Sequence, residues 1–312
     1  MKRTKSNLLG VLALALVGMG GSFLAAAPAQ AAVSCPIYPS PVQTTWPKNG
    51  HIYNCMPTPR NSAETALQAQ ILNTAAIGGN LNTNAKTKLN AKNVDIIVAY
   101  TAVDAFAKAG ITPGVGGEKP IGAGESGRSW VFTNTNATLV NPTTAVFVYT
   151  QTQWNAIPGT PKIPTSYVGS QLTGTVHHEL GHQLDRIWAQ YLGYTPTATA
   201  VVTGTAASHF GVAVNVDGAQ LTPADITTIQ NNYPRLLINP PPAAPVLNFN
   251  EIFAEQVAIN AGGGANSAED TFINAKFRCS TWLVTQMYTN GGTPPASPPN
   301  STGTICNHIT SW

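Results

Sequence analysis

Charged side chains are scarce in this sequence. Lys, Arg, Asp and Glu together make up 9% of the 312 residues. Three of the 16 basic residues, Lys2, Arg3 and Lys5, precede an apolar run that we expect to be removed, which leaves 13 basic against 13 acidic residues. Nucleic acids and anionic membranes are bound by concentrated Lys and Arg. The composition therefore supports neither kind of partner.

Long hydrophobic runs are absent after the first residues of the chain. The run 8–17 is short and flanked by glycine, and the small-residue motif Ala29-Gln30-Ala31 follows it. This order is typical of a secretory signal peptide cut after Ala31, and an uncleaved N-terminal anchor is the alternative. The remainder, about 280 residues, is long enough for one two-lobed domain with a substantial core.

Cysteine is limited to four residues, and none of them is arranged as C-x-x-C. The lack of this spacing argues against a metal site built from these cysteines. An even number of Cys after a signal peptide predicts two disulfides formed in an oxidising compartment. Of the three possible connectivities, local pairing of Cys35 with Cys55 and of Cys279 with Cys306 closes the shortest loops. A short prosegment that carries Cys35 is an alternative for the N-terminal end.

Histidine is also scarce, and half of it lies in one short stretch. Three of the six His fall between His177 and His182. The surrounding sequence predicts a buried amphipathic helix that begins with Ser170 as its N-cap and stops at Gly193. Its apolar residues recur at helical spacing and are Val176, Leu180, Leu184, Ile187, Trp188 and Tyr191.

The pattern H-E-x-x-H lies inside this predicted helix, as His178, Glu179 and His182. Residues four apart share a helix face, so the two imidazoles can point at one metal ion. Glu179 can then act as general base toward a water molecule, as in zinc peptidases. His177 points about a quarter-turn away from His178 and is expected to be structural. A buried helix whose histidines only make hydrogen bonds would show the same pattern.

A third metal ligand is needed for a catalytic zinc site, which takes three protein ligands. One known solution places a third His six residues after the motif and a Gly three residues after it, but Trp188 and Asp185 occupy these positions. The other common solution is a glutamate on a later helix. Glu251 and Glu255 are four apart, so one can ligate the metal while the other orients a ligand histidine. A solvated helix face with two acids is the alternative.

These two stretches together resemble the gluzincin metallopeptidases. The sequence H-E-L-G-H-x-x-D followed by N-E-x-x-A-E is most similar to the anthrax lethal factor and Pro-Pro endopeptidase group. The resemblance implies that Glu251 is the third zinc ligand and that Glu255 and Asp185 are supporting acids. It covers only two short segments, so it implies no particular substrate.

The sequence departs from that group at one functional position. The group has a Tyr seven residues before the ligand Glu, where it stabilises the oxyanion, and this chain has Ala244 there. Tyr233 and His209 lie in the intervening segment and are the candidates for a replacement donor, of which we select Tyr233. The favoured alternative for each is an ordinary partly buried aromatic residue or surface His.

The rest of the sequence predicts a mixed set of helices and strands. Residues 32–60 are expected to wrap the surface, tied by the first disulfide, and residues 114–127 to form a loop. Helices are predicted at 61–76, 101–109, 222–232, 248–260 and 267–290, and strands at 94–99, 130–133 and 144–149. The run 144–149 is either a core strand or the sheet edge to which a peptide substrate adds as a strand.

Together these observations predict an α+β, zincin-like fold. After the signal peptide 1–31 and an N-terminal extension 32–60, the domain 61–312 comprises a lobe 61–193, with a small mixed sheet and the metal-binding helix, and a helical lobe 194–312, with a cleft between them. The expected function is that of a secreted endopeptidase dependent on Zn²⁺ and acting on polypeptides. A zinc hydrolase of cell-wall peptide and a non-enzymatic secreted binding protein are the alternatives.

Overall fold

The computed structural model describes residues 34–38, 51–59, 61–77, 81–115, 118–130, 142–150, 152–153, 170–188, 209–238, 246–264, 266–297 and 306. The chain divides into two units, Met1–Ala31 and Ala32–Trp312. The first unit is the predicted signal peptide and lies outside the described residues, so all that follows concerns the second. None of the described helices is both long enough and apolar enough to span a bilayer.

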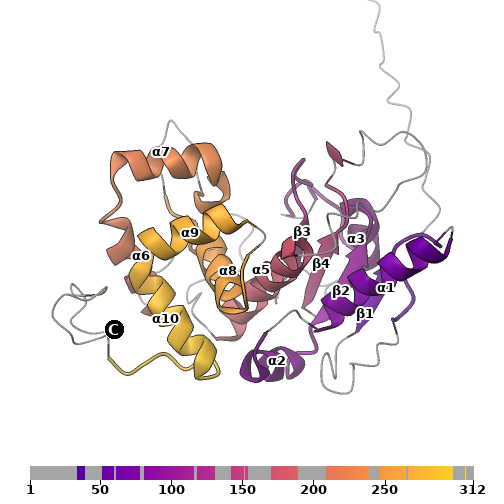
Figure 1. The fold of residues 1–312 in the computed structure, drawn as a ribbon, viewed down its shortest axis with the longest axis horizontal. Helices are drawn as coiled ribbons and strands as arrows, with labels where there is room; N and C mark the ends of the chain where they lie inside the picture. Colours follow the sequence, from indigo (N-terminus) through magenta and orange to yellow (C-terminus); the bar gives the residue numbers. More distant parts are fainter. Residues whose placement is uncertain are drawn as a thin grey trace, which may run out of the picture. The chain divides into compact units, whose positions relative to one another are not determined.

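A four-stranded mixed sheet lies in the N-terminal half of this unit (Figure 1). Its strands are β1 (Ile52–Cys55), β2 (Asp95–Ala99), β3 (Gly127–Trp130) and β4 (Thr143–Phe147), in the spatial order β1-β2-β4-β3. β1, β2 and β4 are parallel, and β3 runs antiparallel to β4. β2 and β4 are buried along their whole length, as expected for β-branched runs covered on both faces. The predicted strands at 94–99 and 144–149 are thus confirmed.

The N-terminal segment contributes a strand that the sequence analysis missed. β1 lies within residues 32–60, which were expected only to wrap the surface, yet it pairs with β2 over its full length and Ile52 is fully buried. The disulfide between Cys35 and Cys55 ties the preceding segment to the end of β1, as predicted. A strand of only four residues, with Asn54 among them, gives too weak a periodic signal to be recognised from sequence.

Each face of the sheet packs against different helices. On one face, Ile97, Ala99 and Phe147 pack with Phe106 of α3 (Ala102–Ala109). On the other, Ile96, Val98 and Val146 belong to the larger core. That core also contains the apolar residues of α1 (Ser62–Ile77), α2 (Thr83–Asn90) and α5 (Ser170–Ile187). The alternation along β2 and β4 follows from the two-residue period of a strand.

The α3 helix shows why its boundaries could be predicted. The Thr101 side chain accepts a hydrogen bond from the Asp104 amide and caps the N-terminus, and Gly110 ends the helix with a φ of 70°. Few residues other than glycine adopt this left-handed conformation readily. By contrast, α2 was not predicted, although Asn82 caps it in the same way.

The α5 helix carries the H-E-x-x-H motif and links the sheet to the C-terminal helices. It contacts β3 and β4 on one side and α8 (Phe249–Asn260) on the other (Figure 1). Leu172, Val176, Leu180 and Leu184 are completely buried, which matches the predicted apolar stripe. The predicted stop at Gly193 lies outside the described residues.

The C-terminal half is helical among its described residues. Besides α8 it contains α6 (His209–Gly218), α7 (Pro223–Asn232), the short 3₁₀ helix η2 (Pro234–Leu236), α9 (Ser267–Lys276) and α10 (Arg278–Thr289). The predicted start of α7 is confirmed, since Thr222 and Asp225 form a reciprocal capping box. α6 was not predicted.

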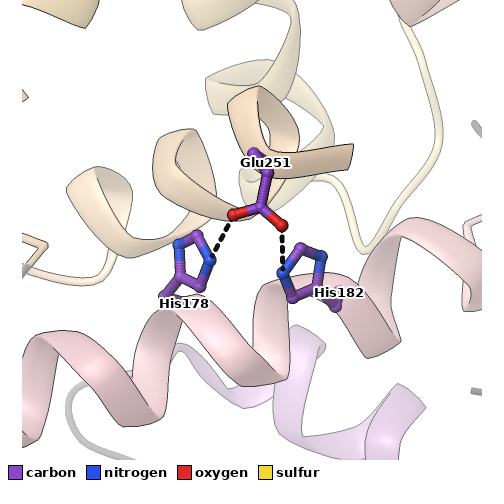
Figure 2. Close-up of side chains that lie close together, drawn as sticks. All are labelled: His178, His182 and Glu251. Carbon is purple, nitrogen blue, oxygen red and sulfur yellow. Dashed lines mark hydrogen bonds and ion pairs between the residues drawn. The ribbon is translucent and has the colours of Figure 1, made fainter. Parts of the chain in front are cut away.

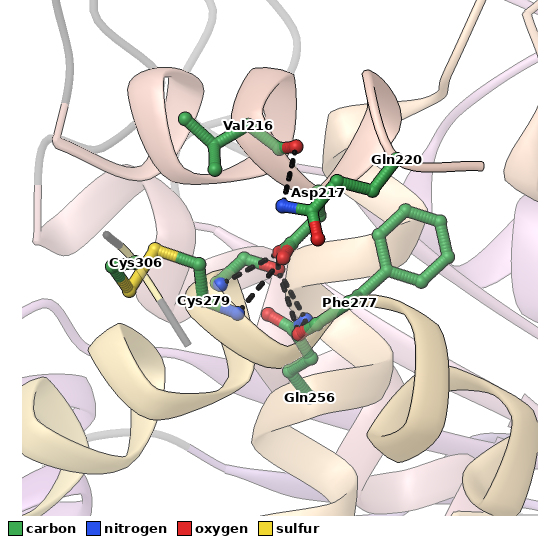
Figure 3. The surroundings of a disulfide bond; sticks show 8 residues. Val216, Asp217, Gln220, Gln256, Phe277, Cys279 and Cys306 are labelled. Carbon is green, nitrogen blue, oxygen red and sulfur yellow. Dashed lines mark hydrogen bonds between the residues drawn. A yellow bond between two sulfur atoms is a disulfide. The ribbon is translucent and has the colours of Figure 1, made fainter. Parts of the chain in front are cut away.

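The prediction of a single helix at 267–290 is wrong, because the helix is interrupted at Phe277 and continues as a second helix. This fully buried residue has φ −107° and ψ 52°, outside the helical region. The amides of Cys279 and Ser280, left free at the start of α10, donate to the buried Asp217 carboxylate of α6 at 2.9 and 2.8 Å (Figure 3). The break is thus stabilised by a cap that comes from more than sixty residues away.

The second predicted disulfide, Cys279–Cys306, joins the C-terminal tail to the first turn of α10 (Figure 3). Both cysteines are fully buried. The structure therefore shows an α+β chain with a small mixed sheet, helices and two disulfides.

Candidate metal centre

Two helices approach each other unusually closely at the motif. Gly181 of α5 faces the backbone of Ala254 in α8, and a Cβ on Gly181 would lie 2.8 Å from both the Cα and the carbonyl oxygen of Ala254. Real Cβ atoms do not approach backbone atoms this closely, so only glycine permits the contact. The glycine within H-E-L-G-H thus brings the side chains of α8 within reach of the two histidines.

The three predicted ligands meet where these helices cross (Figure 2). The Nε2 atom of His178 lies 3.2 Å from Oε2 of Glu251, and Nε2 of His182 lies 3.5 Å from Oε1 of the same carboxylate. One donor atom from each residue falls within 4.8 Å of the others, so the group could hold a metal ion. Two imidazole nitrogens and one carboxylate oxygen form a donor set that suits zinc.

Glu255 orients the first histidine from the opposite side. Its Oε2 atom lies 2.8 Å from Nδ1 of His178, and the carboxylate is fully buried one helical turn after Glu251. A hydrogen bond from Nδ1–H to a carboxylate leaves the lone pair of Nε2 available to a metal. The geometry is the one expected for the supporting acid.

The site favours positive charge. Burial alone would raise the pKa of Glu251, but the His182 and His178 imidazoles and the guanidinium of Arg235 hold it well below the ordinary range. Burial and Arg235 would lower the pKa of His178, but the Glu251 and Glu255 carboxylates raise it to about 10. The buried Glu255 and the half-buried Glu251 carboxylates around one imidazole create a negative potential that a divalent cation would neutralise.

Glu179 lies on the sheet side of the same helix and is 6% exposed. Its carboxylate packs against Gly127 of β3, where a Cβ would lie 2.7 Å from Cγ and Oε1 of Glu179. Burial is the main cause that raises the pKa of Glu179 to about 7. Its Oε2 atom has no hydrogen-bond partner among the described residues. A carboxylate with a pKa near neutrality and one oxygen without a hydrogen-bond partner has the properties of a general base.

Side-chain hydrogen bonds attach the strands β3 and β4 to α5. The Ser129 hydroxyl donates to the main-chain carbonyl of Glu179 at 2.6 Å, and the buried Gln183 amide donates to the carbonyls of Trp130 and Thr143 at 3.2 and 3.1 Å. β3 is thereby held above the motif, at the edge of the sheet. Of the two alternatives for residues 144–149, the core strand is confirmed and the substrate-binding edge is not, because β4 lies between β2 and β3.

Tyr233, the predicted oxyanion donor, ends α7 and is 9% exposed. Its ring packs against Phe272 with the centroids 5.3 Å apart. In the described part of the chain, no hydrogen bond or ring contact joins Tyr233 to the three metal-site residues. His209, the other candidate, forms the start of α6, and burial lowers its pKa.

Asp185 and His177 also lie on α5 and are buried. Burial raises the pKa of Asp185 to about 7, and no hydrogen bond from Asp185 to either metal-site imidazole is seen among the described side chains. The Nδ1 atom of His177 lies 3.4 Å from the carbonyl oxygen of Gly263, and burial lowers the pKa of His177 to about 4. His177 therefore has the structural environment expected for it.

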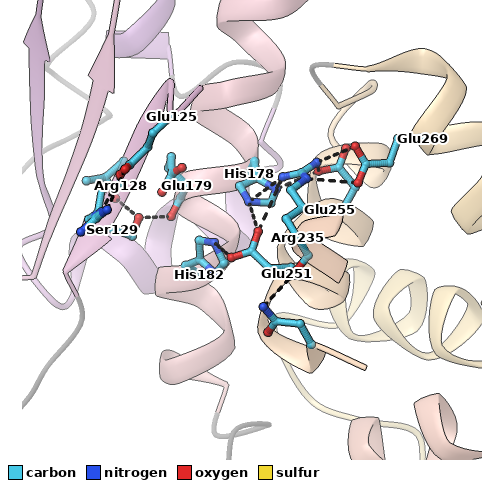
Figure 4. Close-up of polar contacts among 12 residues, drawn as sticks. Glu125, Arg128, Ser129, His178, Glu179, His182, Arg235, Glu251, Glu255 and Glu269 are labelled. Carbon is cyan, nitrogen blue, oxygen red and sulfur yellow. Dashed lines mark hydrogen bonds and ion pairs between the residues drawn. The ribbon is translucent and has the colours of Figure 1, made fainter. Parts of the chain in front are cut away.

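Arg235 was missed by the sequence analysis. It lies on η2, and its guanidinium contacts Glu255, Glu269 and the His178 ring (Figure 4). No motif in the sequence marks it, because its partners lie on three other helices. It joins the site only through the tertiary fold.

Comparisons with protein-family models, with curated proteins and with solved structures find no match to this chain. Any functional conclusion therefore rests on the geometry of the site.

Proposed function

We propose that the protein is a secreted zinc-dependent endopeptidase of the gluzincin type. The observation that carries this proposal is the Glu251 carboxylate, whose two oxygens face the Nε2 atoms of His178 and His182. A chance pair of acids on a helix face would have no reason to meet the H-E-x-x-H histidines from another helix.

The donor set fits a zinc ion in chemistry and in surroundings. It consists of two imidazoles and one carboxylate, and the Nδ1 atom of His178 is already engaged by Glu255. Zinc bound by such a set activates water at neutral pH and polarises a carbonyl group. Three protein ligands leave a further position open, as in catalytic rather than structural zinc sites.

The remaining residues divide the chemical work. Glu179 is placed next to the first ligand, and its raised pKa suits it to take a proton from water and pass it to the departing amine. β3 is an edge strand among the described strands, so an extended peptide that adds to the sheet there would lie beside Glu179. An endopeptidase needs its general base close to the strand that binds the substrate peptide. The two disulfides agree with action in an oxidising, extracellular compartment.

The direct test replaces Glu179 by Gln in the mature chain. This change keeps the volume of the side chain and removes its basicity. Hydrolysis of casein should fall by at least about 100-fold, while the zinc content measured by elemental analysis should stay at that of the wild type. Glu64→Gln, in the first turn of α1 and on a different helix from the three site residues, serves as the control and should change neither quantity.

Three results would contradict the proposal. Activity retained in Glu179→Gln would reject Glu179 as the base. A purified wild-type chain without zinc, and without response to chelators, would favour a binding protein. Zinc-dependent cleavage of peptidoglycan but not of casein would make the protein a cell-wall hydrolase.

A further inference from the structure

Arg235 is held in place by acids on two helices. Its Nε and Nη2 atoms donate to the two carboxylate oxygens of Glu269 on α9 at 3.1 and 3.0 Å, and Nη2 also donates to Oε2 of Glu255 at 2.7 Å. Glu255 is fully buried and Glu269 is 4% exposed. Such a two-pronged contact fixes the plane of a guanidinium, which a single ion pair does not do.

The third nitrogen of Arg235 reaches the metal-site side chains. Nη1 lies 3.2 Å from Nδ1 and 3.1 Å from Nε2 of His178, and 3.6 Å from Oε2 of Glu251. Nearly equal distances to the two ring nitrogens place Nη1 over the imidazole, not along the lone pair of either nitrogen. Figure 4 shows Arg235 beside His178, Glu251 and Glu255. A guanidinium nitrogen over the ring leaves the in-plane directions of the two ring nitrogens to Glu255 and to a metal.

One oxygen of Glu255 therefore serves two partners. Oε2 accepts from Arg235 and also contacts Nδ1 of His178. The position of this oxygen decides how the His178 ring is rotated about its side-chain bonds. Without Arg235, Glu255 and Glu269 would be two neighbouring buried carboxylates with no cation between them, and their repulsion would move Oε2 from its place.

Arg235 is a poor receptor for the carboxylate of a substrate. Three carboxylates, those of Glu251, Glu255 and Glu269, lie within 4.0 Å of its nitrogens and more than balance its charge. Although its side chain is 36% exposed, two of its three nitrogens are committed to Glu255 and Glu269. The chemistry of this group therefore suits support of the ligands better than capture of an anion.

We propose that Arg235 is a positioning residue of the metal centre: bridging Glu269 and Glu255, it fixes the orientation of His178 and the placement of Glu251 for metal binding. This inference rests on the proposed function for the identity of the metal. The support of the site then consists of a series of contacts from Glu269 on α9, through Arg235 on η2 and Glu255 on α8, to His178 on α5.

The test measures metal affinity in full-length mature protein, by competition with a chromophoric chelator. Arg235→Met should weaken zinc binding by about 10- to 100-fold, the range found when partners of metal ligands are removed. Arg235→Lys keeps the charge but cannot bridge two acids, so its affinity should be intermediate. Glu269→Gln weakens the contact of residue 269 with Arg235 and should also lower the zinc affinity. The control is Lys276→Met, which breaks the ion pair to Asp225 on α7 and should leave affinity unchanged.

The cobalt-substituted protein gives a readout that a loss of stability alone would not move. Arg235→Met should change the visible absorption bands of bound Co²⁺, which report ligand geometry, and Arg235→Lys should restore them in part. Wild-type affinity and spectrum in a folded Arg235→Met protein would overturn the inference, and would point to donation to substrate if kcat alone fell. If Arg235→Met does not fold, an unchanged affinity and spectrum in both Arg235→Lys and Glu269→Gln would overturn it. A wild-type chain that binds no zinc would overturn the proposed function as well.

Discussion

The proposed general base lies against a residue that has no side chain. Gly127 leaves space for the Glu179 carboxylate between α5 and the β3 strand, where a Cβ would be 2.7 Å from Cγ and Oε1 and 3.0 Å from the Ala145 carbonyl. Glu179 is thus positioned by what Gly127 lacks as well as by its own helix.

Gly127→Ala should therefore impair catalysis without removing the metal. Alanine is compatible with the extended backbone here, so the expected effect is a displacement of Glu179 and not a general loss of folding. A displacement of about 1 Å at a catalytic group can reduce kcat on the order of 100-fold. The zinc content should not change. Gly124→Ala is the matched control, because a Cβ there meets nothing within 4 Å. Equal kcat values for the two variants would show that Gly127 does not position the base.

The candidate ligands could be predicted from sequence because their relationships are local. His178 and His182, and likewise Glu251 and Glu255, are pairs four apart on one helix, so the period of the helix places each pair on a common face. Gly127 and Arg235 act through contacts with residues more than 40 positions away or on other helices. No periodic pattern in a single sequence records such a contact.

At the scale of elements, the crossing of α5 and α8 creates the site. Gly181 lies at the crossing, directly against the main chain of Ala254. Gly181→Ala adds a residue with higher helix propensity, which in an open helix would stabilise by about 1 kcal/mol. Here the added methyl group would push the helices apart.

We therefore expect Gly181→Ala to destabilise the protein by about 1–3 kcal/mol, the usual cost of overpacking. It should also weaken zinc binding, because Glu251 moves away from the histidines. Unfolding in urea and the chelator competition measure both effects. Since the clash involves backbone atoms of Ala254, adding Ala254→Gly should not restore either quantity. A more stable Gly181→Ala protein would show that the helices do not need this close approach.

An ion pair between Asp225 and Lys276 links α7 to α9. Asp225 accepts hydrogen bonds from the amide and the hydroxyl of Thr222 at 2.9 and 2.7 Å, and Lys276 lies 2.9 Å from its other oxygen. Lys276, followed by Thr222, lowers the pKa of Asp225 from 3.8 to about 2. A carboxyl whose pKa is depressed on folding adds stability above its unfolded pKa, and that stability is lost as the pH falls toward the folded value.

Asp225→Asn should accordingly lower the urea midpoint at pH 7 and have progressively less effect between pH 4 and pH 2. Lys276→Met should show a smaller loss with the same pH trend, since the Thr222 contacts remain. A destabilisation by Asp225→Asn that is the same at pH 7 and pH 3 would mean that the charge of Asp225 does not contribute.

Helices with capping residues in their own sequence were predicted well. Elements whose bounds depend on tertiary contacts were not. α3, α7 and α8 have recognisable starts or stops and were placed to within one residue of their predicted bounds. The break at Phe277 depends on the Asp217 carboxylate, and β1 depends on pairing with β2. Both are tertiary effects that local propensity does not contain.

At the scale of the whole molecule, the metal should couple the two halves of the chain. His178 and His182 belong to the helix that packs under the sheet, whereas Glu251 belongs to the C-terminal helices. Glu251 is 73 positions from His178 along the sequence, so in the unfolded chain the three residues form no site. An ion bound only by the folded state stabilises that state by mass action.

Zinc at about 100 times its dissociation constant should add about 2.7 kcal/mol to the free energy of unfolding. For a chain of this size we expect a rise of several degrees in the melting temperature, which excess chelator reverses. Glu251→Gln removes a ligand and should lose the zinc-dependent shift, whereas Glu179→Gln removes only the base and should retain it. Calorimetry with and without chelator distinguishes these cases. A wild-type melting temperature that chelator leaves unchanged would mean that no ion joins α5 to α8, and the peptidase proposal would lose its chemical basis.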